Sequence, residues 1–239
     1  MNKKTAPCAP HSSRSLDGVK ILASLTSAER DELARRCNWR DFKDHEQIID
    51  RDSDSRDVYF IVRGAVRVVN YSYSGREVSY DDITEGGFFG EMAAIDGKPR
   101  SATVIALNET TVASLPPETF RRIAADHPEF GLAIMERLVQ IIRGSTDRIM
   151  DLSTRGAYSR VYAELLRLAQ QHQTPDGGGA IDPLPVHTDL ASRAGTTRET
   201  VARAIGRLSR MKVARKRQHG LVFTNLERLE ELVQGDSED

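Results

Sequence analysis

The chain has few cysteines and no long apolar segment. Its 239 residues include two cysteines, Cys8 and Cys37. Two thiols so placed make neither a disulfide framework nor a four-thiolate metal site, so we expect a reducing, cytoplasmic location. No apolar run approaches the roughly 20 residues that cross a bilayer. Lys3 and Lys4 are not followed by the apolar core of a secretion signal, and the Pro, Ser and Thr content there predicts a disordered arm over residues 1–18.

The patterns of metal centres and of enzyme active sites are also missing. The six histidines are scattered, and none lies at metal-ligand spacing from a cysteine or carboxylate partner. We find no nucleophile motif and no Walker loop. The sequence therefore predicts a protein without a metal and without catalytic activity.

The net charge of -1 gives no sign of a nucleic-acid-binding protein, but the distribution of charge does. Nine lysines and arginines lie between Arg193 and Arg217, against the single acid Glu199. A local basic segment attracts a phosphate backbone more than the total charge does. The basic segment therefore predicts a DNA contact near the C-terminus.

The hydrophobic pattern changes twice along the chain. Residues 19–37 have helical spacing, with Thr26 or Ser27 as the cap. Between residues 46 and 115, short β-branched runs alternate with turn formers, which is typical of an antiparallel roll or barrel. The predicted strands are 58–62, 65–69, 102–106 and 111–115. The helical period then returns, and the predicted helices are 117–126, 128–153 and 156–173.

The C-terminal part reads as a small DNA-binding domain. Residues 174–180 are glycine-rich and predict a flexible connection. Two short helices are expected around Gly195, followed by a hairpin over residues 213–223 that turns at His219 and Gly220. Asn225 is placed to cap a last short helix.

Residues 88–104 carry the most informative motif. Gly90 permits close approach of the backbone to a ligand, and a one-turn helix after it would present backbone N–H groups to an anion. Arg100 can pair with a phosphate through two N–H groups, and Glu91 can accept from a sugar hydroxyl. The segment therefore predicts a site for a phosphorylated sugar.

This motif closely resembles the phosphate-binding cassette of the cyclic-nucleotide-binding domain, and residues 22–153 resemble that domain in the Crp/Fnr family of bacterial transcription regulators. The resemblance implies that Gly90, Ser101 and Ala102 contact the cyclic phosphate, Arg100 neutralises it, and Glu91 holds the ribose 2′-hydroxyl. The residues expected to contact the nucleotide are Gly90, Glu91, Met92, Arg100, Ser101, Ala102, Ser145 and Thr146. The alternative is a plain β-roll in which Glu91 and Arg100 form an internal ion pair.

The long helix over residues 128–153 is expected to form a homodimer. Its predicted seam contains Ile134, Leu138, Ile141, Ser145, Ile149 and Leu152. The alternative is a helix that packs on its own roll. By the resemblance, Ser145 and Thr146 contact the base from two subunits, although the cAMP-binding relatives have the order Thr-Ser. The ligand is expected to be cAMP, with cGMP as the alternative, because a Thr at the Ser101 position contacts guanine in cGMP-dependent kinases.

Residues 187–208 form a helix-turn-helix pattern. Leu190, Ala191 and Ala194 are expected to face inward from the first helix; Val201, Ile205 and Leu208 form the buried stripe of the second. Arg198, Glu199 and Arg203 would then face base edges, because Arg pairs with guanine and Glu with cytosine. These three residues resemble the family's reader of TGTGA-like half-sites, and Gly206 departs from it. Thr188, Thr197 and Thr200 are expected at phosphates.

The sequence thus predicts an α+β fold with an antiparallel cyclic-nucleotide-binding β-roll, a long dimerisation helix and a C-terminal winged helix-turn-helix. The domain bounds are 1–18 for the arm, 19–127 for the roll, 128–155 for the helix and hinge, and 156–239 for the DNA-binding domain. The expected function is nucleotide-controlled binding of a homodimer to palindromic double-stranded DNA, with RNA polymerase as a partner and no membrane. The alternatives are a Crp/Fnr-type regulator that needs no nucleotide, and a nucleotide-binding module of another class.

Overall fold

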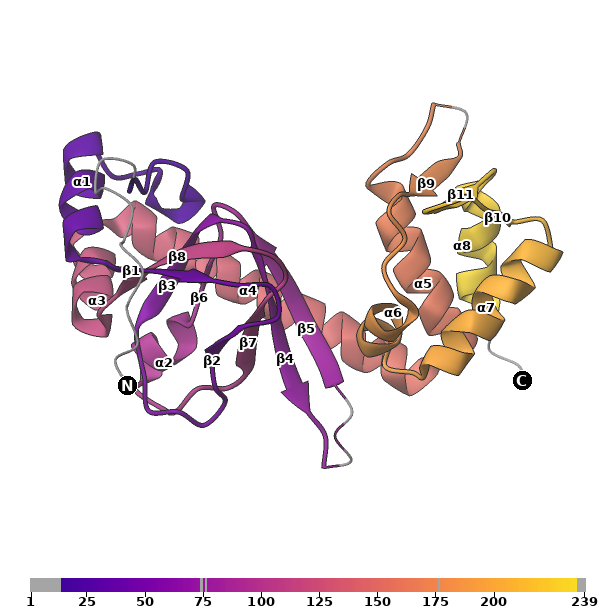
Figure 1. Cartoon of the computed structure of the whole chain (residues 1–239), viewed down its shortest axis with the longest axis horizontal. Coiled ribbons are helices and arrows are strands. Elements are labelled where there is room, and N and C mark those ends of the chain that lie inside the picture. The colour runs from indigo at the N-terminus through magenta and orange to yellow at the C-terminus, as the bar shows by residue number, and fades with distance from the viewer. Residues whose placement is uncertain (1–13, 74, 76, 176, 236–239) are drawn as a thin grey trace, which may run out of the picture. The chain divides into compact units, whose positions relative to one another are not determined.

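The computed structural model describes residues 14–73, 75, 77–175 and 177–235 (Figure 1). Contacts divide the chain into two compact units. The first contains Met1–Val69 and Asp81–Arg137, and the second contains Asn70–Tyr80 and Leu138–Asp239. The tip of one β-hairpin therefore belongs with the C-terminal part of the chain, although its strands begin in the roll.

The roll consists of two antiparallel sheets with strand orders β1-β8-β3-β6 and β2-β7-β4-β5. The strands are β1 Asn38–Phe42, β2 Gln47–Ile49, β3 Val58–Arg63, β4 Ala65–Tyr71, β5 Glu77–Thr84, β6 Phe88–Phe89, β7 Thr103–Ala106 and β8 Thr110–Leu115. Apolar side chains that alternate along these strands meet between the sheets, with Phe42, Ile61 and Val112 in the core. Three of the four predicted strand segments lie within β3, β4 and β8, and the fourth, 102–106, begins one residue before β7.

Three predictions about the start of the chain need correction. Residues 19–37 do not form one helix: a short 3-10 helix, η2 (Lys20–Leu22), precedes α1 (Ser27–Arg36). Thr26 caps α1 and exchanges hydrogen bonds with Glu29, as a capping box does. Strand β1 was not predicted. The predicted arm extends too far, since Leu16 is buried; residues 1–13 of it lie outside the described residues.

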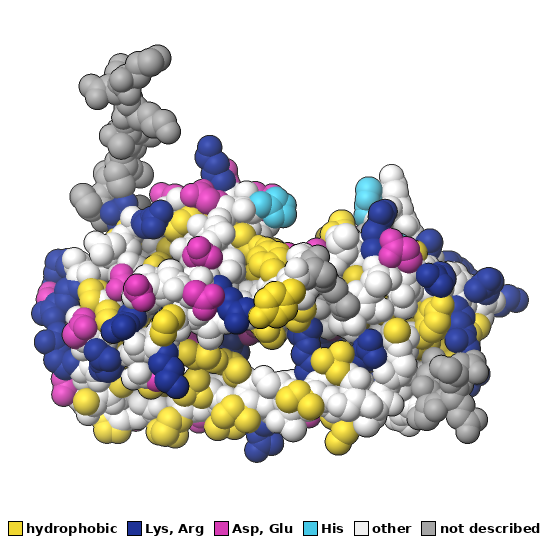
Figure 2. Space-filling model, turned by 90° about the horizontal axis from the view of Figure 1, so that it is seen from below, with side chains coloured by type: hydrophobic (Ala, Val, Ile, Leu, Met, Phe, Trp, Pro, Cys, Tyr) yellow, Lys and Arg dark blue, Asp and Glu magenta, His cyan; other side chains and the backbone are white. Residues whose placement is uncertain are grey.

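The helices α3 (Pro117–Asp126) and α4 (Pro128–Thr154) follow the predicted bounds closely. Ile134 of the predicted seam is buried, and Leu138 and Ile141 are half-buried. The large apolar side chains that α4 leaves exposed are Leu132, Met135, Val139, Ile142, Ile149, Met150 and Leu152; Ile149 and Leu152 belong to the predicted seam and the others do not. Five of them, Leu132, Met135, Val139, Ile142 and Ile149, form a stripe with spacings of three, four, three and seven residues, the heptad pattern of a helix that meets another helix. Figure 2 shows hydrophobic side chains recurring along the long helix.

The C-terminal elements have one shared core. They are α5 Ala157–Gln170, β9 Gly179–Ile181, α6 His187–Ala194, α7 Arg198–Arg210, β10 Ala214–Lys216, β11 Leu221–Phe223 and α8 Leu226–Gly235. Tyr162, Leu165, Ile205 and Phe223 are almost fully buried in this core. The predicted helix-turn-helix and hairpin are confirmed, and Asn225 Oδ1 accepts from the amide of Arg228 at the start of α8, 3.0 Å away.

One part of the predicted flexible connection is a strand. Gly179 and Ala180 belong to β9, which pairs with β11 and makes a three-stranded sheet of order β10-β11-β9. Glycine has low strand propensity, so the local sequence does not indicate this pairing. At Gly179, a Cβ atom would lie 2.9 Å from the carbonyl oxygen of Ala169, so the close packing of β9 on α5 requires glycine.

Candidate functional site

The predicted phosphate-binding segment forms a tight turn followed by one short helix. Strand β6 ends at Phe89, Gly90 adopts a left-handed conformation with φ 86°, and α2 (Glu91–Asp96) begins directly after it. A Cβ at position 90 would lie 2.6 Å from Arg100 Nη1 and 2.9 Å from the Asp57 carbonyl oxygen. Both the conformation and the space therefore require glycine.

Arg100 is buried and is held from three sides. Its Nε donates to Ser55 Oγ at 3.1 Å, Nη1 donates to the Gly90 carbonyl at 2.9 Å, and Nη2 donates to the Asp57 carbonyl at 2.7 Å. Its Cζ also lies 5.6 Å from the centre of the Tyr59 ring. Burial lowers the pKa of Arg100. A guanidinium has five N–H groups, so this clamp fixes its orientation and leaves donor capacity for an anion.

Glu91 is also buried, and burial raises its pKa, whereas its own amide and the charges of Arg137 and Arg100 lower it. Among the described residues it forms no ion pair with Arg100 within 4.0 Å, so the internal pair that was the alternative from the sequence is not present. A buried carboxylate with a raised pKa is a candidate for a ligand-binding position.

The other predicted nucleotide contacts are placed as follows. Ser101 is exposed and its hydroxyl lies 3.6 Å from the sulfur of Met92, which is exposed too; Ala102 is half-buried. Ser145 and Thr146 are exposed on α4 in the second unit. Their hydroxyls donate to Ile141 O at 2.8 Å and Ile142 O at 3.0 Å. Met92, Ser101 and Ala102 thus lie in the same segment as Gly90 and Arg100. The hydroxyls of Ser145 and Thr146 instead bond to backbone carbonyls within α4.

The residues that hold Arg100 carry no recognisable sequence motif and were not predicted. Ser55, Asp57 and Tyr59 precede it by more than 40 positions, and Tyr59 stacks on Phe89 with ring centres 5.1 Å apart. Two of the three acceptors around Arg100 are backbone carbonyls, which any sequence can supply. Backbone hydrogen bonds of Arg100 with Asp52 and Ser53 bring these distant segments together, so no local motif could identify the contacts.

The second predicted site is the helix pair α6 and α7. Gly195 ends α6 with φ 62°, and Thr197 begins α7 by accepting from the amide of Thr200 at 3.3 Å. The stripe Val201, Ile205 and Leu208 is fully buried, as predicted. This burial fixes which side of α7 faces outward.

On that outward side, Arg198, Glu199 and Arg203 are all exposed. The pKa of Glu199 is lowered by hydrogen bonds from its own amide and from Thr197, and by the charges of Arg198 and Arg203. The ionised, hydrogen-bond-accepting form of Glu199 is therefore favoured beside two cationic donors, and groups of these types can pair with cytosine and guanine edges. Thr188 is exposed at the start of α6, and Thr200 is half-buried with its hydroxyl 3.1 Å from that of Thr197.

The pKa of His187, the first residue of α6, depends in part on the positive charges nearby. Its pKa is lowered, first by burial and then by the charges of Lys216 and Arg198. Lys216 lies on β10, so the hairpin and the start of α7 both bring cations close to the start of α6. These basic groups are predicted to contact phosphates.

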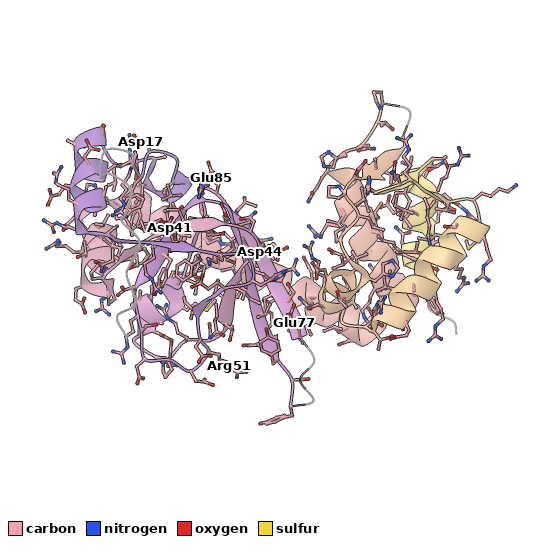
Figure 3. The ribbon with its side chains drawn as sticks, viewed as in Figure 1. Asp17, Asp41, Asp44, Arg51, Glu77 and Glu85 are labelled. Atoms are coloured by element: carbon pink, nitrogen blue, oxygen red, sulfur yellow. The ribbon has the colours of Figure 1, made fainter. Side chains whose placement is uncertain are left out.

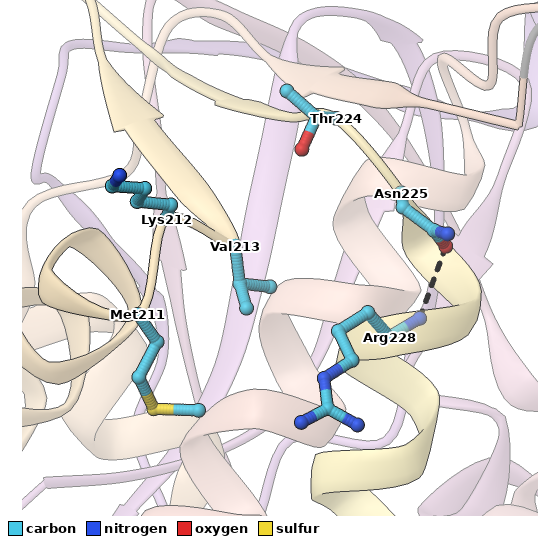
Figure 4. A pocket seen from close by; sticks show the side chains of 6 residues that line it. All are labelled: Met211, Lys212, Val213, Thr224, Asn225 and Arg228. Carbon is cyan, nitrogen blue, oxygen red and sulfur yellow. Dashed lines mark hydrogen bonds between the residues drawn. The ribbon is translucent and has the colours of Figure 1, made fainter.

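A hollow of about 470 Å³ also lies in the C-terminal domain. Its walls are drawn in Figure 4 and consist of Met211, Lys212, Val213, Thr224, Asn225 and Arg228. None of these residues is among the predicted nucleotide or DNA contacts. The hollow therefore shares no residue with either predicted site.

The described residues contain neither a metal-binding cluster nor a membrane-spanning helix. No group of three or more histidine, cysteine, aspartate or glutamate side chains there is placed to hold a metal ion. Likewise, no helix in the described part of the chain is both long enough and apolar enough to cross a membrane.

Comparison with known proteins identifies two domains. Residues 39–127 match the cyclic nucleotide-binding domain and residues 159–232 match the Crp-like helix-turn-helix domain. A CRP-like cAMP-activated global transcriptional regulator of Mycobacterium tuberculosis is 26% identical over 72% of this chain and 77% of its own length.

Solved structures have the same fold. The catabolite activator protein of Thermus thermophilus matches 90% of this chain and 98% of its own, with 26% identity and a TM-score of 0.51. A CooA mutant from Carboxydothermus hydrogenoformans matches 83% of this chain and 88% of its own, with 20% identity and a TM-score of 0.72.

Proposed function

The chain belongs to the Crp/Fnr family of DNA-binding transcription regulators, and from this premise we propose that it is a homodimer that binds cAMP and reads a palindromic, TGTGA-like DNA site. The Mycobacterium tuberculosis relative is a cAMP-activated transcriptional regulator, and RNA polymerase is the partner that such an activity implies. The proposal has three parts: the ligand, the dimer and the DNA sequence.

The proposal that the ligand is a cyclic nucleotide rests on the burial and the contacts of Glu91 and Arg100. Both side chains are buried in the cassette, and in the described residues the partners of Arg100 are Ser55, Gly90 and Asp57 rather than Glu91. A cyclic nucleotide has one phosphate charge for the guanidinium and one ribose 2′-hydroxyl for the carboxylate, so it satisfies both groups at once. We take cAMP as the ligand and keep cGMP as the alternative, because a Ser at position 101 retains a hydroxyl that a guanine amino group can use.

The exposed stripe of α4 supports the dimer. A run of large apolar side chains at heptad spacing is costly to leave in water, and a second copy of the same helix would cover it in a two-fold arrangement. Replacing Ile142 by Asp would put a charge in the middle of this stripe. We expect sedimentation analysis to find a monomer for Ile142→Asp, and a dimer for the control Glu136→Asp. A dimeric Ile142→Asp would contradict this role of the stripe.

The recognition face supports the DNA part. Arg198, Glu199 and Arg203 are exposed on one side of α7, which offers donors for guanine on both sides of an acceptor for cytosine. Two such helices in a dimer would read half-sites about one DNA turn apart, roughly 34 Å. The two half-sites would then be related by the same two-fold axis as the protein.

Calorimetry and DNA titration test the proposal together. Calorimetry with cAMP and with cGMP gives each affinity, and we expect cAMP to bind at micromolar concentration or below. Titration of a palindromic TGTGA-containing duplex with and without the nucleotide then gives the response. Equal DNA affinity in both conditions would favour a regulator that needs no nucleotide, whereas nucleotide binding without any DNA binding would favour a regulatory module of another class.

A further inference from the structure

The hydroxyl of Ser192 in α6 forms hydrogen bonds with the backbone edge of strand β5. Strand β5 is the last strand of its sheet, so one side of it lacks a strand partner. Ser192 of α6 occupies that side: the amide of Ser79 donates to Ser192 Oγ at 2.8 Å, and Ser192 Oγ donates to the Glu77 carbonyl at 3.2 Å. Ser79 and Ser192 are both buried, and Figure 3 labels Glu77 at the start of β5.

Arg148 of α4 joins the same contact. One guanidinium nitrogen donates to the carbonyl of Ser79, and the other donates to the carbonyl of Ser192 at 3.2 Å. Its Cζ lies 6.0 Å from the centre of the Tyr80 ring. A single arginine thus binds the backbone of β5 and the backbone of α6, and all of these residues belong to the second unit.

The chemistry of this contact favours two discrete states. Its partners are a hydroxyl, a guanidinium, an amide and carbonyls, and buried groups of this kind are costly when only some of them are satisfied. When the contact opens fully, water satisfies all of them. An apolar contact would instead lose stability in proportion to the area exposed. The polar contact is therefore suited to open and close as a unit.

A second arginine ties the same strand to the same helix. Arg137 Nη2 lies 2.5 Å from Asp81 Oδ2, two residues beyond Ser79 on β5. Arg137 and Arg148 are eleven residues apart, about three helical turns, so they lie on the same side of α4. Arg137 and Asp81 also contribute to the electrostatic environment of Glu91. The strand that Arg148 binds is thus also held, two residues on, by a pair that acts on the proposed ligand site.

We propose that Arg148 and Ser192 form a latch that fixes the first helix of the DNA reader to β5, so that the reader follows the hairpin. Arg148 is a positioning residue: it binds no DNA or ligand itself, and it acts through Ser192. The recognition residues of α7 remain exposed while the latch is closed, so the latch orients the reader without covering it. Its use in nucleotide control rests on the proposed function, but the existence of the latch does not.

Hydrogen exchange tests the latch without any ligand. We expect Arg148→Ala and Ser192→Ala to raise exchange about tenfold in two peptides, one covering residues 77–82 and one covering residues 187–195. The matched controls are Arg143→Ala, an exposed arginine of the same helix, and Ser209→Ala, whose hydroxyl donates only to Ile205 O within α7. If the hairpin peptide exchanges faster while the α6 peptide does not change, the two elements are not coupled and the latch is refuted.

DNA titration of the full-length protein tests the positioning role. For the wild type, the ratio of DNA affinity with cAMP to that without it measures the response. We expect this ratio to fall towards one in Arg148→Ala and Ser192→Ala, and the double variant to lose no more than either single one. A ratio as large as that of the wild type would overturn the positioning role. A wild type that does not respond to nucleotide would count against the proposed function, and the exchange result would still decide the latch.

Discussion

Two regions of the chain are proposed to bind phosphate through arginine, and their arginines are held in opposite ways. In the roll, Arg100 is buried and three oxygen acceptors fix its orientation. In the C-terminal domain, Arg198 and Arg203 are exposed on α7. The buried guanidinium cannot adjust to a ligand, so it selects one geometry. The exposed ones can adjust, and they suit a long polyanion whose local shape varies.

The difference also predicts how each region responds to its surroundings. A buried pair is screened little by salt, whereas contacts between exposed cations and DNA release counterions and weaken steeply as salt rises. Nucleotide affinity should therefore change little between about 50 and 200 mM salt. DNA affinity should fall strongly over the same range. The predictions below test this contrast, from the largest expected effect to the smallest.

The largest effect is expected at Arg100. Arg100→Gln removes the charge and leaves the carbonyls of Gly90 and Asp57 with fewer donors, so nucleotide affinity should fall on the order of 100-fold or more. Calorimetry measures the loss, and circular dichroism checks that the variant is folded. Arg63→Gln, an exposed arginine of β3, is the control and should bind as the wild type does. Normal affinity in Arg100→Gln would show that the cassette does not bind the phosphate.

A smaller effect is expected on the exposed face. Arg198→Ala should cost about 1–3 kcal/mol of DNA binding and should relax the preference at one base pair only. Arg215→Ala, on the exposed side of β10, should instead weaken all sequences alike and reduce the salt slope by about one. Competition titrations with single-base variants of the duplex separate the two. An Arg198→Ala variant that retains the full sequence preference would contradict its assigned contact.

Glu91 tests whether ligand binding and stability oppose each other. Because its pKa is raised in the folded chain, the ionised form is disfavoured there, and stability is lost as pH rises through the folded pKa. Glu91→Gln should therefore be more stable than the wild type at neutral pH, and this difference should vanish on acidification below the ordinary pKa of a glutamate. Its nucleotide affinity should fall about tenfold, because the ribose loses a charged acceptor. Denaturation at several pH values and calorimetry measure both changes, and a variant that loses stability at neutral pH would refute the argument.

Local motifs explain which features the sequence could predict. The turn at Gly90 and the buried stripe of α7 each depend on neighbours a few residues away, and both lie as predicted. The clamp on Arg100 depends on contacts with residues 52–57, more than 40 positions earlier in the chain. Backbone carbonyls supply two of its three acceptors, and they leave no signature in a sequence.

The missed strands have the same cause. β1 contains Asn38, Arg40 and Asp41, and it exists because β8 pairs with it along five residues. On α4 the exposed stripe shares Ile149 with the predicted seam but contains Val139 and Ile142 in place of Leu138 and Ile141, because Ile134 is buried and the helix has two apolar series. Periodicity shows that a helix has an apolar side but does not show which of two series lies outward.

The smallest predicted effect uses His187 to measure the cationic face of the DNA reader. Its pKa lies below the ordinary value because of burial first, and then because of Lys216 and Arg198. The folded chain therefore favours neutral His187, and stability falls as pH drops through the ordinary pKa of histidine towards the folded one. Lys216→Ala should raise the pKa of His187, since it removes a like charge, and bound DNA should raise it further because phosphates favour the protonated ring. Proton NMR of the His187 ring measures both shifts. Lys43→Ala in the roll is the control, and a fall in the pKa on adding DNA would mean that this end of α6 does not face the phosphates.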